Sequence, residues 1–266
     1  KQDKFLYDSN NDKFNTILKT VHDLHGVNST ILLYGESGTG KEVIAKLIHK
    51  TSLRTNGNFV PINCGAIPEN LIESELFGHV QGAFTDAKSN VKGKVEIADG
   101  GTLFLDEVNE LSMKAQVALL RFLQEREIVP VGSERRVKVD VRIIVATNRD
   151  LLKLIKEGLF REDLYYRINV FPIQLPPLRK RKEDIIALAN WFISEFQREY
   201  SRPFEMLTEE AQKELLNYHW PGNIRELRNC IERASILTKG KKIPKTSLLL
   251  PTNPDIQEPL DYEKKP

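Results

Sequence analysis

The sequence predicts an α/β fold, in which a parallel sheet is flanked by helices and a small all-helical subdomain follows. Between residues 31 and 175, short apolar runs rich in β-branched residues alternate with helical patterns, as they do in sheets that carry helices on both faces. After Pro176 and Pro177 the pattern becomes wholly helical. We therefore expect an α/β subdomain over residues 1–176 and a helical subdomain over residues 177–250.

Each element is placed by its apolar pattern. Buried strands are expected at residues 31–34, 59–63, 102–105, 141–147 and 170–175. Helices are expected at 42–51, 114–125 and 151–157 in the first subdomain, and at 183–200, 208–218 and 224–238 in the second. Residues 251–266 mix proline with charge and lack apolar periodicity, so we expect a linker or a disordered tail there.

Composition restricts the class and location of the protein. The 266 residues are 40% hydrophobic, and the net charge of +2 gives no overall field that would attract nucleic acid. The apolar runs are too short to cross a bilayer. Cys64 and Cys230 lack neighbours at metal-binding spacing, so we expect two reduced, buried thiols. Together these features predict a cytoplasmic protein without membrane contact, and the tail and the initial Lys1 suggest a domain of a longer protein.

The stretch GESGTGKE fits a phosphate-binding loop except at its last position. Gly35, Gly40 and Lys41 match the pattern G-x-x-x-x-G-K, which normally continues with a Ser or Thr that contacts Mg²⁺, whereas here Glu42 follows. The stretch lies between an expected strand and an expected helix, as the motif requires. We expect its backbone N–H groups and Lys41 to bind the phosphates of a nucleotide. The residues concerned are Gly35, Glu36, Ser37, Gly38, Thr39, Gly40, Lys41 and Glu42.

Two carboxylates follow the strand expected at 102–105. Ligands of open α/β sheets bind outside the carboxyl ends of the strands, where Asp106 and Glu107 stand. We expect Asp106 to hold Mg²⁺, directly or through water, and Glu107 to orient or deprotonate an attacking water. Glu42 lies in the first turn of a helix, where a carboxylate is favoured, and could hold a metal-bound water.

Two asparagines end other expected strands. Asn148 would emerge beside the proposed water site and is a candidate sensor of the γ-phosphate. Asn63 could hydrogen-bond Glu107 in one nucleotide state and release it in another. Asparagine is also a common turn residue, so the turn interpretation stays open for both.

Three arginines stand out from the other basic residues. Arg161 and Arg167 are six residues apart in FREDLYYR, which on a regular helix is a rotation of about 240°, so they would point in different directions. In WPGNIREL, a Pro-Gly turn precedes an expected cap at Asn223, and Arg225 lies in the first turn of the next helix. A cation there opposes the helix dipole, so a phosphate near Arg225 would be favourable.

Eight motifs stand in order along the chain: GESGTGKE, ESELFGH, GAFTDA, GGTLFLDE, ATN, FREDLYYR, LPPLRKR and WPGNIREL. Together they resemble the AAA+ domain, a P-loop NTPase, of bacterial enhancer-binding proteins, the NtrC-like activators of sigma-54 RNA polymerase. The resemblance covers roughly residues 10 to 240. That family is similar in carrying Glu at the position of Glu42, so the departure from the general motif identifies the subfamily.

The resemblance implies a role for each motif residue. Lys41 would bind phosphate, Asp106 and Glu107 would form the Walker B pair, and Asn63 would be the switch that restrains Glu107. Asn148 would be the first sensor, and Arg225, from the lid, would be the second. Arg161 and Arg167 match the arginine fingers that family members insert into a neighbouring subunit, which implies a homo-oligomeric ring, a hexamer or a heptamer.

The loop by which this family contacts the sigma factor is GAFTGA, and here it is GAFTDA. Asp86 replaces a glycine, which removes backbone freedom and adds a negative charge, although Asp tolerates a left-handed φ. The resemblance assigns the sigma-factor contact to Gly82, Ala83, Phe84, Thr85, Asp86 and Ala87. By residue type alone, an apolar Ala-Phe-Thr run would belong to a core. Residues 131–138 form a second candidate surface loop.

The function that these observations predict is that of a Mg-ATP hydrolase whose ring remodels promoter-bound sigma-54 RNA polymerase. The alternative is an ATP-gated regulatory or repressor module that no longer engages sigma-54 because of Asp86. A general AAA+ remodeller of proteins is disfavoured by the GAFT stretch. The residues after 240 are too few for a helix-turn-helix reader, so enhancer DNA would be bound through a domain outside this fragment.

Overall fold

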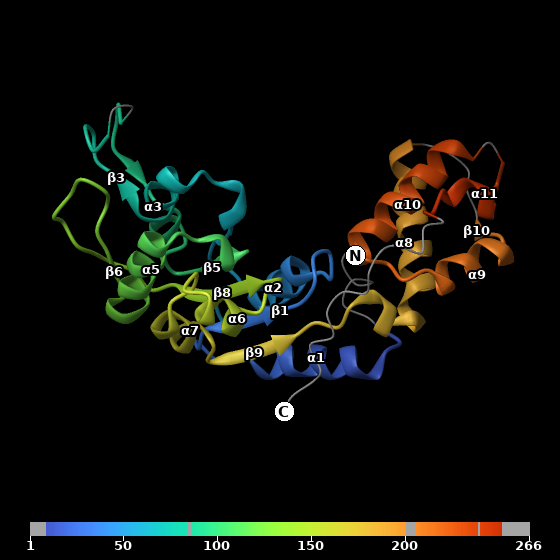
Figure 1. The fold of residues 1–266 in the computed structure, drawn as a ribbon, viewed down its shortest axis with the longest axis horizontal. Helices are drawn as coiled ribbons and strands as arrows, with labels where there is room; N and C mark the ends of the chain where they lie inside the picture. The colour runs from blue at the N-terminus through green and yellow to red at the C-terminus, as the bar shows by residue number, and fades with distance from the viewer. Residues whose placement is uncertain (1–8, 85–86, 201–205, 239, 252–266) are drawn as a thin grey trace. The chain divides into compact units, whose positions relative to one another are not determined.

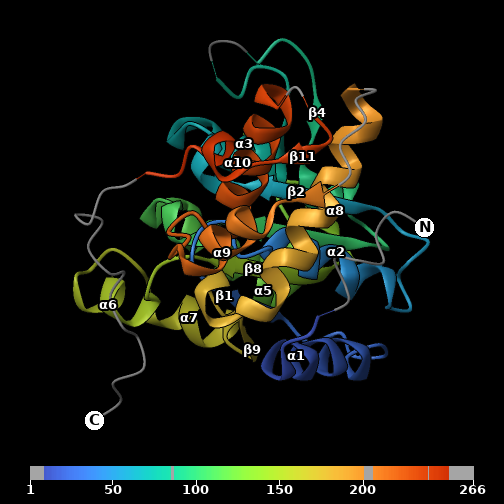
Figure 2. The same ribbon diagram turned by 90° about the vertical axis from the view of Figure 1, so that its right-hand side faces the viewer.

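The computed structural model describes residues 9–84, 87–200, 206–238 and 240–251, which form two compact units. The α/β unit comprises residues 17–35 and 41–175. The helical unit comprises the described residues within 1–16, 36–40 and 176–266. Residues 36–40, the middle of the expected phosphate loop, therefore belong to the helical unit, whereas Gly35 and Lys41 belong to the α/β unit. Figures 1 and 2 show the elements of each unit.

The α/β unit is built on a parallel five-stranded sheet with the strand order β2-β5-β8-β1-β9. Its strands are β1 (Ile31–Tyr34), β2 (Phe59–Asn63), β5 (Thr102–Asp106), β8 (Arg142–Thr147) and β9 (Phe171–Gln174). All five expected strands are confirmed within one residue at either end. Residues of β5 and β8 are almost entirely buried because both strands lie inside the sheet with helices over them, as in other parallel sheets.

The helices of this unit follow the strands. The expected helices are confirmed as α2 (Lys41–Lys50), α5 (Met113–Glu125) and α6 (Leu151–Lys156). Two of them have a side-chain N-cap. The Ser112 hydroxyl accepts from Ala115 N at the start of α5, and the Asp150 carboxylate accepts from Leu152 N and Lys153 N at the start of α6. Further helices that the sequence analysis did not place are α3 (Glu69–Phe77), α4 (Lys94–Ile97) and α7 (Glu162–Ile168).

Two short hairpins extend the α/β unit. One pairs β3 (Gly78–His79) with β4 (Val91–Lys92), and the other pairs β6 (Glu127–Ile128) with β7 (Val137–Lys138). The two hairpins touch through a bridge between His79 and Val131. Backbone bonds from Val80 N to Val131 O and from Val131 N to Gly78 O, 3.1 and 2.8 Å long, fix this contact. The two candidate surface loops are therefore joined at their bases.

The helical unit packs around α8 (Lys182–Tyr200) and α10 (Asn223–Leu237), which lie side by side. It also contains α9 (Glu209–Asn217), α11 (Lys245–Leu248) and the short strands β10 (Met206–Leu207) and β11 (Lys242–Ile243). Trp220 is fully buried in its core and donates its indole N–H to Leu215 O at 2.8 Å. None of the helices among the described residues has the length and apolar character needed to span a membrane.

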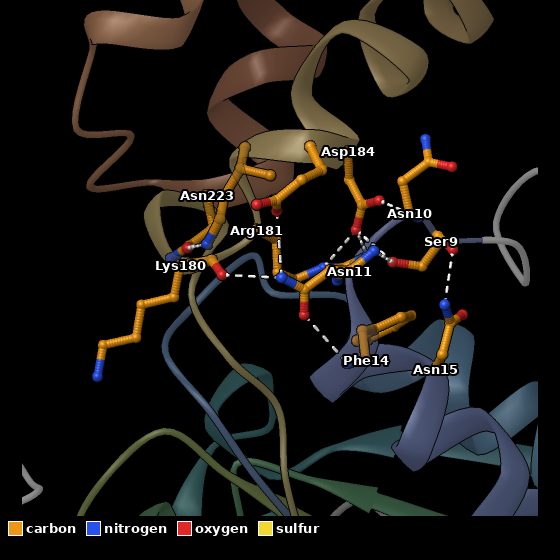
Figure 3. Close-up of polar contacts among 11 residues, drawn as sticks. Ser9, Asn10, Asn11, Phe14, Asn15, Lys180, Arg181, Asp184 and Asn223 are labelled. Atoms are coloured by element: carbon orange, nitrogen blue, oxygen red, sulfur yellow. Dashed lines mark hydrogen bonds and ion pairs between the residues drawn. The ribbon is translucent and has the colours of Figure 1, made fainter.

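The N-terminal segment that leads into α1 (Asp12–Asp23) is fixed to the beginning of α8, as Figure 3 shows. Asp184 accepts hydrogen bonds from Ser9 Oγ at 2.6 Å and from Asn10 N at 2.7 Å. The same carboxylate pairs with Arg181, whose Nε lies 2.8 Å from Oδ2, and both side chains are only 5% exposed. The Arg181 guanidinium also lies 3.4 Å from the ring centroid of Phe14. We call Ser9–Phe14 the N-terminal strap.

Candidate functional site

The sheet register brings the polar strand ends of the α/β unit to one edge. Asn63 and Asp106 are direct partners in the β2–β5 pair, and Tyr34 and Thr147 are partners in the β1–β8 pair. Gly35 and Asn148 come next in the chain after the second pair. Carboxyl ends of parallel strands are where α/β sheets bind ligands. Five of the residues expected from the sequence lie along or beside this edge: Gly35, Asn63, Asp106, Glu107 and Asn148.

Lys41 begins α2 and is 7% exposed. Its ammonium donates to Gly35 O at 2.8 Å, so the side chain folds back across the loop that precedes the helix. Gly38 and Gly40 have φ of +78° and +97°, a backbone conformation that side chains with a Cβ rarely adopt. Gly40 belongs to the motif and Gly38 stands at one of its variable positions, and the positive φ explains the preference for glycine at both.

Asp106 and Glu107 lie where β5 ends. Asp106 Oδ1 accepts the N–H of Glu107 at 3.0 Å, and Glu107 has φ of +55°, a left-handed conformation that is uncommon for Glu. Burial raises the pKa of Asp106, and the opposing charge of Lys41 reduces but does not cancel this effect. The carboxylate of Glu107 lies close to Gly65, since a Cβ at residue 65 would be 2.7 Å from Glu107 Oε2.

Asn63 is engaged with its own turn. Its Oδ1 accepts from Gly65 N at 2.9 Å and from Ala66 N at 3.2 Å, capping a 3₁₀ turn. Among the described residues, Asn63 and Glu107 share no hydrogen bond in this conformation, although Asn63 Oδ1 and Glu107 both lie over Gly65. Cys64 is buried beside them, and burial together with the charges of Asp106 and Glu107 raises its pKa to about 12. Both cysteines are free and buried, as expected.

Asn148 carries a buried oxygen, Oδ1, that has no hydrogen-bond partner within the part of the chain that the structure describes. Buried polar atoms are nearly always paired, so an unpaired one at a sheet edge fits a group that completes its contacts with a ligand or a water. The preceding Thr147 donates its hydroxyl to Asn109 Oδ1 at 2.7 Å. Asn109 was not predicted from the sequence, because an Asn two residues after a carboxylate pair carries no pattern of its own.

The residues at this edge fit a magnesium ion that is held mostly by water and phosphate. Within the described residues, no group of three or more His, Cys, Asp or Glu side chains forms a protein-only metal site. Mg²⁺ in phosphoryl-transfer sites is commonly bound by one or two carboxylates while phosphates and waters supply the other ligands, and Asp106 provides such a carboxylate. Glu42 pairs with Lys46 at 2.7 Å on the surface of α2, yet its charge contributes to the raised pKa of Asp106.

The two finger candidates differ in their contacts. Arg161 precedes α7 and forms a bidentate pair with Asp163, at 3.0 and 2.7 Å, in which both side chains are at least one-third exposed. Arg167, in the last turn of α7, donates from Nη2 to Leu123 O at 2.7 Å. Because Arg161 is the N-cap of α7 and has an extended backbone, the helical rotation expected from their spacing does not apply to this pair. Neither arginine contacts Asp106, Glu107 or Asn148 among the described residues.

The described residues of the GAFTDA segment, Gly82–Phe84 and Ala87, lie between β3 and β4. Gly82 has φ of +81° and donates to Ala87 O at 2.9 Å, while Ala87 N donates to Phe84 O at 2.9 Å. Phe84 is 37% exposed and packs edge-on against His79, with ring centroids 4.9 Å apart. Ala83 contacts Gly132 of the second loop. Thr85 and Asp86 lie outside the described residues.

Residues of the helical unit bind the middle of the phosphate loop. Arg225 donates from Nη1 to Ser37 Oγ at 2.9 Å, and Ile224 N donates to Gly38 O at 2.9 Å. The expected cap at Asn223 is wrong, because Gly222 is the N-cap of α10 and has no side-chain cap bond. Asn223 instead turns its side chain toward Leu178 N and Ser37 O.

Comparison with protein families identifies both parts of the chain. A model described as "Sigma-54 interaction domain" matches residues 8–174, and one described as "AAA+ ATPase lid domain" matches residues 179–257. The first alone covers more than half of the chain.

Individual relatives agree with these families. The chain is 52% identical to a Nif-specific regulatory protein of Herbaspirillum seropedicae over 227 residues, which are 85% of this chain and 42% of that protein. It is 51% identical to the DNA-binding transcriptional activator HyfR of Escherichia coli over 241 residues, 89% of this chain and 36% of that one. The crystal structure of NtrX from Brucella abortus in complex with ADP is similar with a TM-score of 0.83 and 38% identity, covering 90% of this chain and 54% of that chain.

The chain spans less than half the length of the two sequence relatives. The order of the motifs, the parallel sheet, the helical unit and both family matches agree. The chain belongs to the sigma-54 interaction domain family, the AAA+ ATPase domains of NtrC-like sigma-54-dependent activators.

Proposed function

We propose that this chain is a Mg-ATP-hydrolysing motor that assembles into a homo-oligomeric ring, a hexamer or a heptamer, and remodels sigma-54 RNA polymerase to activate transcription. The observation that carries the proposal is the alignment of Asn63, Asp106 and Thr147–Asn148 along one sheet edge, with the Lys41 charge near enough to offset part of the rise that burial causes in the pKa of Asp106. The same α/β unit bears a loop whose Phe84 is partly exposed. The strand-end residues of the ATPase site and the output loop thus belong to the same unit.

In this proposal each residue of the edge has a separate task in hydrolysis. Backbone N–H groups of residues 35–42 and the Lys41 ammonium bind phosphate oxygens. Mg²⁺, held by Asp106 directly or through water, would neutralise charge that develops on the phosphates. Glu107 orients the attacking water and accepts its proton at a carboxylate oxygen. Asn148 Oδ1 or its amide contacts the water or the γ-phosphate, and Asn63 restrains Glu107 by exchanging its present turn bonds for one to that carboxylate.

Arg225 is proposed as the second sensor and Arg161 as the finger that is easier to release. An exposed ion pair such as Arg161–Asp163 contributes little stability, so moving the guanidinium to a neighbour's phosphate costs little. Arg167 can act in the same way only by leaving the carbonyl of Leu123. Both remain candidates.

The cellular setting completes the proposal. We place the protein in the cytoplasm, with enhancer DNA bound only through a domain outside this fragment and with no membrane partner. The names of the relatives support a signal-responsive regulator of transcription, since one is a DNA-binding activator and another regulates nif genes by its name. A two-component mode of control is one form that such a response takes.

The test is whether a trapped nucleotide state holds the sigma factor. The chain is incubated with ADP, aluminium fluoride, Mg²⁺ and sigma-54, and complexes are separated by gel filtration. We expect a stable complex that Lys41→Ala abolishes, because phosphate binding would be lost. A chain that hydrolyses ATP normally but forms no such complex would refute the remodelling role and favour the ATP-gated module.

A further inference from the structure

Glu36 is a puzzling residue in a loop that binds anions, because its carboxylate adds negative charge beside the phosphates. The structure places that carboxylate against Arg179, whose Nη1 and Nη2 donate to Oε2 and Oε1 at 2.8 and 2.7 Å. A two-pronged guanidinium–carboxylate contact is among the strongest hydrogen-bonded pairs in proteins and fixes the orientation of both groups. Glu36 is therefore anchored to Arg179, which lies in the 3₁₀ turn Leu178–Lys180 before α8.

Asn223 joins the same contact. Its Nδ2 donates to Glu36 Oε2 at 3.1 Å and to Ser37 O at 3.0 Å, while its Oδ1 accepts Leu178 N at 2.8 Å. The side chain is fully buried, and the residue has φ of +51°, which Asn tolerates better than most residues. One amide thus connects the loop, the segment before α8 and the start of α10.

The backbone confirms how closely the loop and α10 approach each other. Ile224 N donates to Gly38 O at 2.9 Å, and a Cβ on Gly38 would lie 2.4 Å from Gly222 O. Glycine is therefore required at residue 38 for this approach as well as for its positive φ. Asn223 and Ile224, at the start of α10, thus donate to the carbonyls of Ser37 and Gly38 in turn.

Charge favours the same arrangement. Burial alone would raise the pKa of Glu36, but the hydrogen bonds from Arg179 and Asn223, together with the positive charges of Arg179 and Lys180, outweigh burial and lower it. The carboxylate is thus kept ionised and is compensated by a guanidinium within the same unit. An anion so compensated repels an incoming phosphate far less than a free one would.

We infer that Glu36, Arg179 and Asn223 are positioning residues that hold the loop in its phosphate-binding conformation, and that the Glu36 side chain is not itself a nucleotide ligand. The inference rests on the proposed role of residues 35–42 in binding phosphate. A preformed loop presents its backbone N–H groups to phosphates that ATP and ADP share. Loss of the contacts among Glu36, Arg179 and Asn223 should therefore lower the affinity for ATP and for ADP by a similar factor. Loss of a γ-phosphate sensor would lower the affinity for ATP alone.

The experiment measures the Kd of Mg-ATP and Mg-ADP by calorimetry, and kcat at saturating ATP, for the full chain. Arg179→Ala removes the bidentate partner of the Glu36 carboxylate and should raise both Kd values about tenfold, the effect of one charge-assisted hydrogen bond. The kcat should stay unchanged once ATP saturates the site. Adding Glu36→Ala to Arg179→Ala removes the carboxylate that has lost its guanidinium partner and should recover part of the affinity.

Asn223→Asp is a second variant that preserves shape, tolerance of positive φ and the acceptor for Leu178 N. It replaces the donating Nδ2 by an oxygen that faces Glu36 and Ser37 O, so it should also weaken ATP and ADP alike. Arg228→Ala, on the same helix but beside Phe196 and Glu195, is the matched control and should leave both Kd values unchanged. Thermal melts identify any variant that fails to fold, in which case the other variant decides.

Unchanged Kd values in well-folded Arg179→Ala and Asn223→Asp, or a loss confined to ATP, would overturn the inference. Lys41→Ala separates this result from the role of the loop itself. If Lys41→Ala binds nucleotide normally, the loop assignment fails. If it does not bind while the other two variants bind normally, only the positioning role fails.

Discussion

Glu107 combines a left-handed backbone with a carboxylate at the end of a buried strand. A non-glycine residue at φ of +55° is strained, and such strain is tolerated where a functional group must take a particular direction. Its backbone N–H donates to Asp106 Oδ1, so the orientation of the Asp106 side chain depends on the backbone conformation of Glu107. Substitutions that keep this backbone conformation therefore test the role of the side chains alone.

Glu107→Gln keeps the shape of the side chain and removes its ability to accept a proton. We expect ATP binding to persist and turnover to fall by roughly 100-fold to 10,000-fold, as when a positioned base is removed. Steady-state hydrolysis and nucleotide titration measure the two quantities. Near-normal turnover would show that Glu107 is not the base.

Asp106→Asn tests the electrostatic description of the same edge. The pKa of Asp106 is raised in the folded chain, chiefly by burial, so folding disfavours its ionised form. This penalty is absent below the ordinary carboxyl pKa, develops as pH rises through it, and is complete above the folded pKa. Without nucleotide or Mg²⁺, Asp106→Asn should therefore melt at a higher temperature at neutral pH, and the gain should vanish in acid. A variant that is less stable at neutral pH would contradict this assignment of the charge.

Single residues show where sequence reasoning reaches its limit. Lys41, Asp106 and Asn148 can be placed because a motif or a strand end fixes their position. Asn223 was expected to cap its own helix, since the sequence gives the residue type but not the direction of its side chain. Its contacts with Leu178 and Ser37 join segments far apart in the chain, as do those between Asn109 and Thr147. No local pattern encodes such contacts.

At the scale of elements, the sheet and its main helices followed from apolar periodicity because each buries a face of regular spacing. The hairpin β3–β4 was not predicted as strands, since Val91 and Lys92 are exposed and two-residue strands have no period to detect. Helix α7 was also missed as an element, although the spacing of Arg161 and Arg167 was interpreted on a helix; only Arg167 lies on it. Short elements are defined by tertiary contacts more than by propensity.

The loop between β3 and β4 can be changed without changing the strand-end residues. Phe84 is 37% exposed and rests on His79, so Phe84→Ala should keep ATPase activity and ring formation while abolishing sigma-54 binding and open-complex formation. A core Phe would instead cost about 3 to 5 kcal/mol of stability when truncated and would lower every activity together.

Leu53→Ala, which truncates another exposed apolar side chain of the α/β unit, is the control and should retain sigma-54 binding. Normal activation by well-folded Phe84→Ala would exclude the contact. Asp86→Gly is the companion variant, chosen from the sequence alone. A gain in activation would mean that the Asp86 charge or stiffness weakens output, and a loss would mean that Asp86 pairs with a cation of the polymerase.

At the scale of the whole molecule, the proposed ring would bring one subunit's arginines to its neighbour's nucleotide. Subunits with Arg161→Ala or Arg167→Ala are mixed with Lys41→Ala subunits, each variant being inactive alone. Mixed rings should recover part of the ATPase activity, because a Lys41→Ala subunit can still donate its arginines. Mass spectrometry confirms mixing. Absence of recovery in mixed rings would mean that the arginines serve their own subunit, in line with the contacts to Asp163 and Leu123.

The N-terminal strap has a mechanical consequence. Tension applied to the chain ahead of Ser9 would be borne first by the Asp184 carboxylate, which is only three residues from the guanidinium of Arg181 that stacks on Phe14. The short stretch 178–184 holds this strap at one end and, through Arg179, the phosphate loop at the other. Tension on the N-terminal strap and nucleotide binding at the loop would thus both act on residues 178–184. We expect hydrogen exchange of the Asn10 amide to slow when nucleotide is bound. Equal exchange rates with and without nucleotide would show that the strap and the nucleotide site are not coupled.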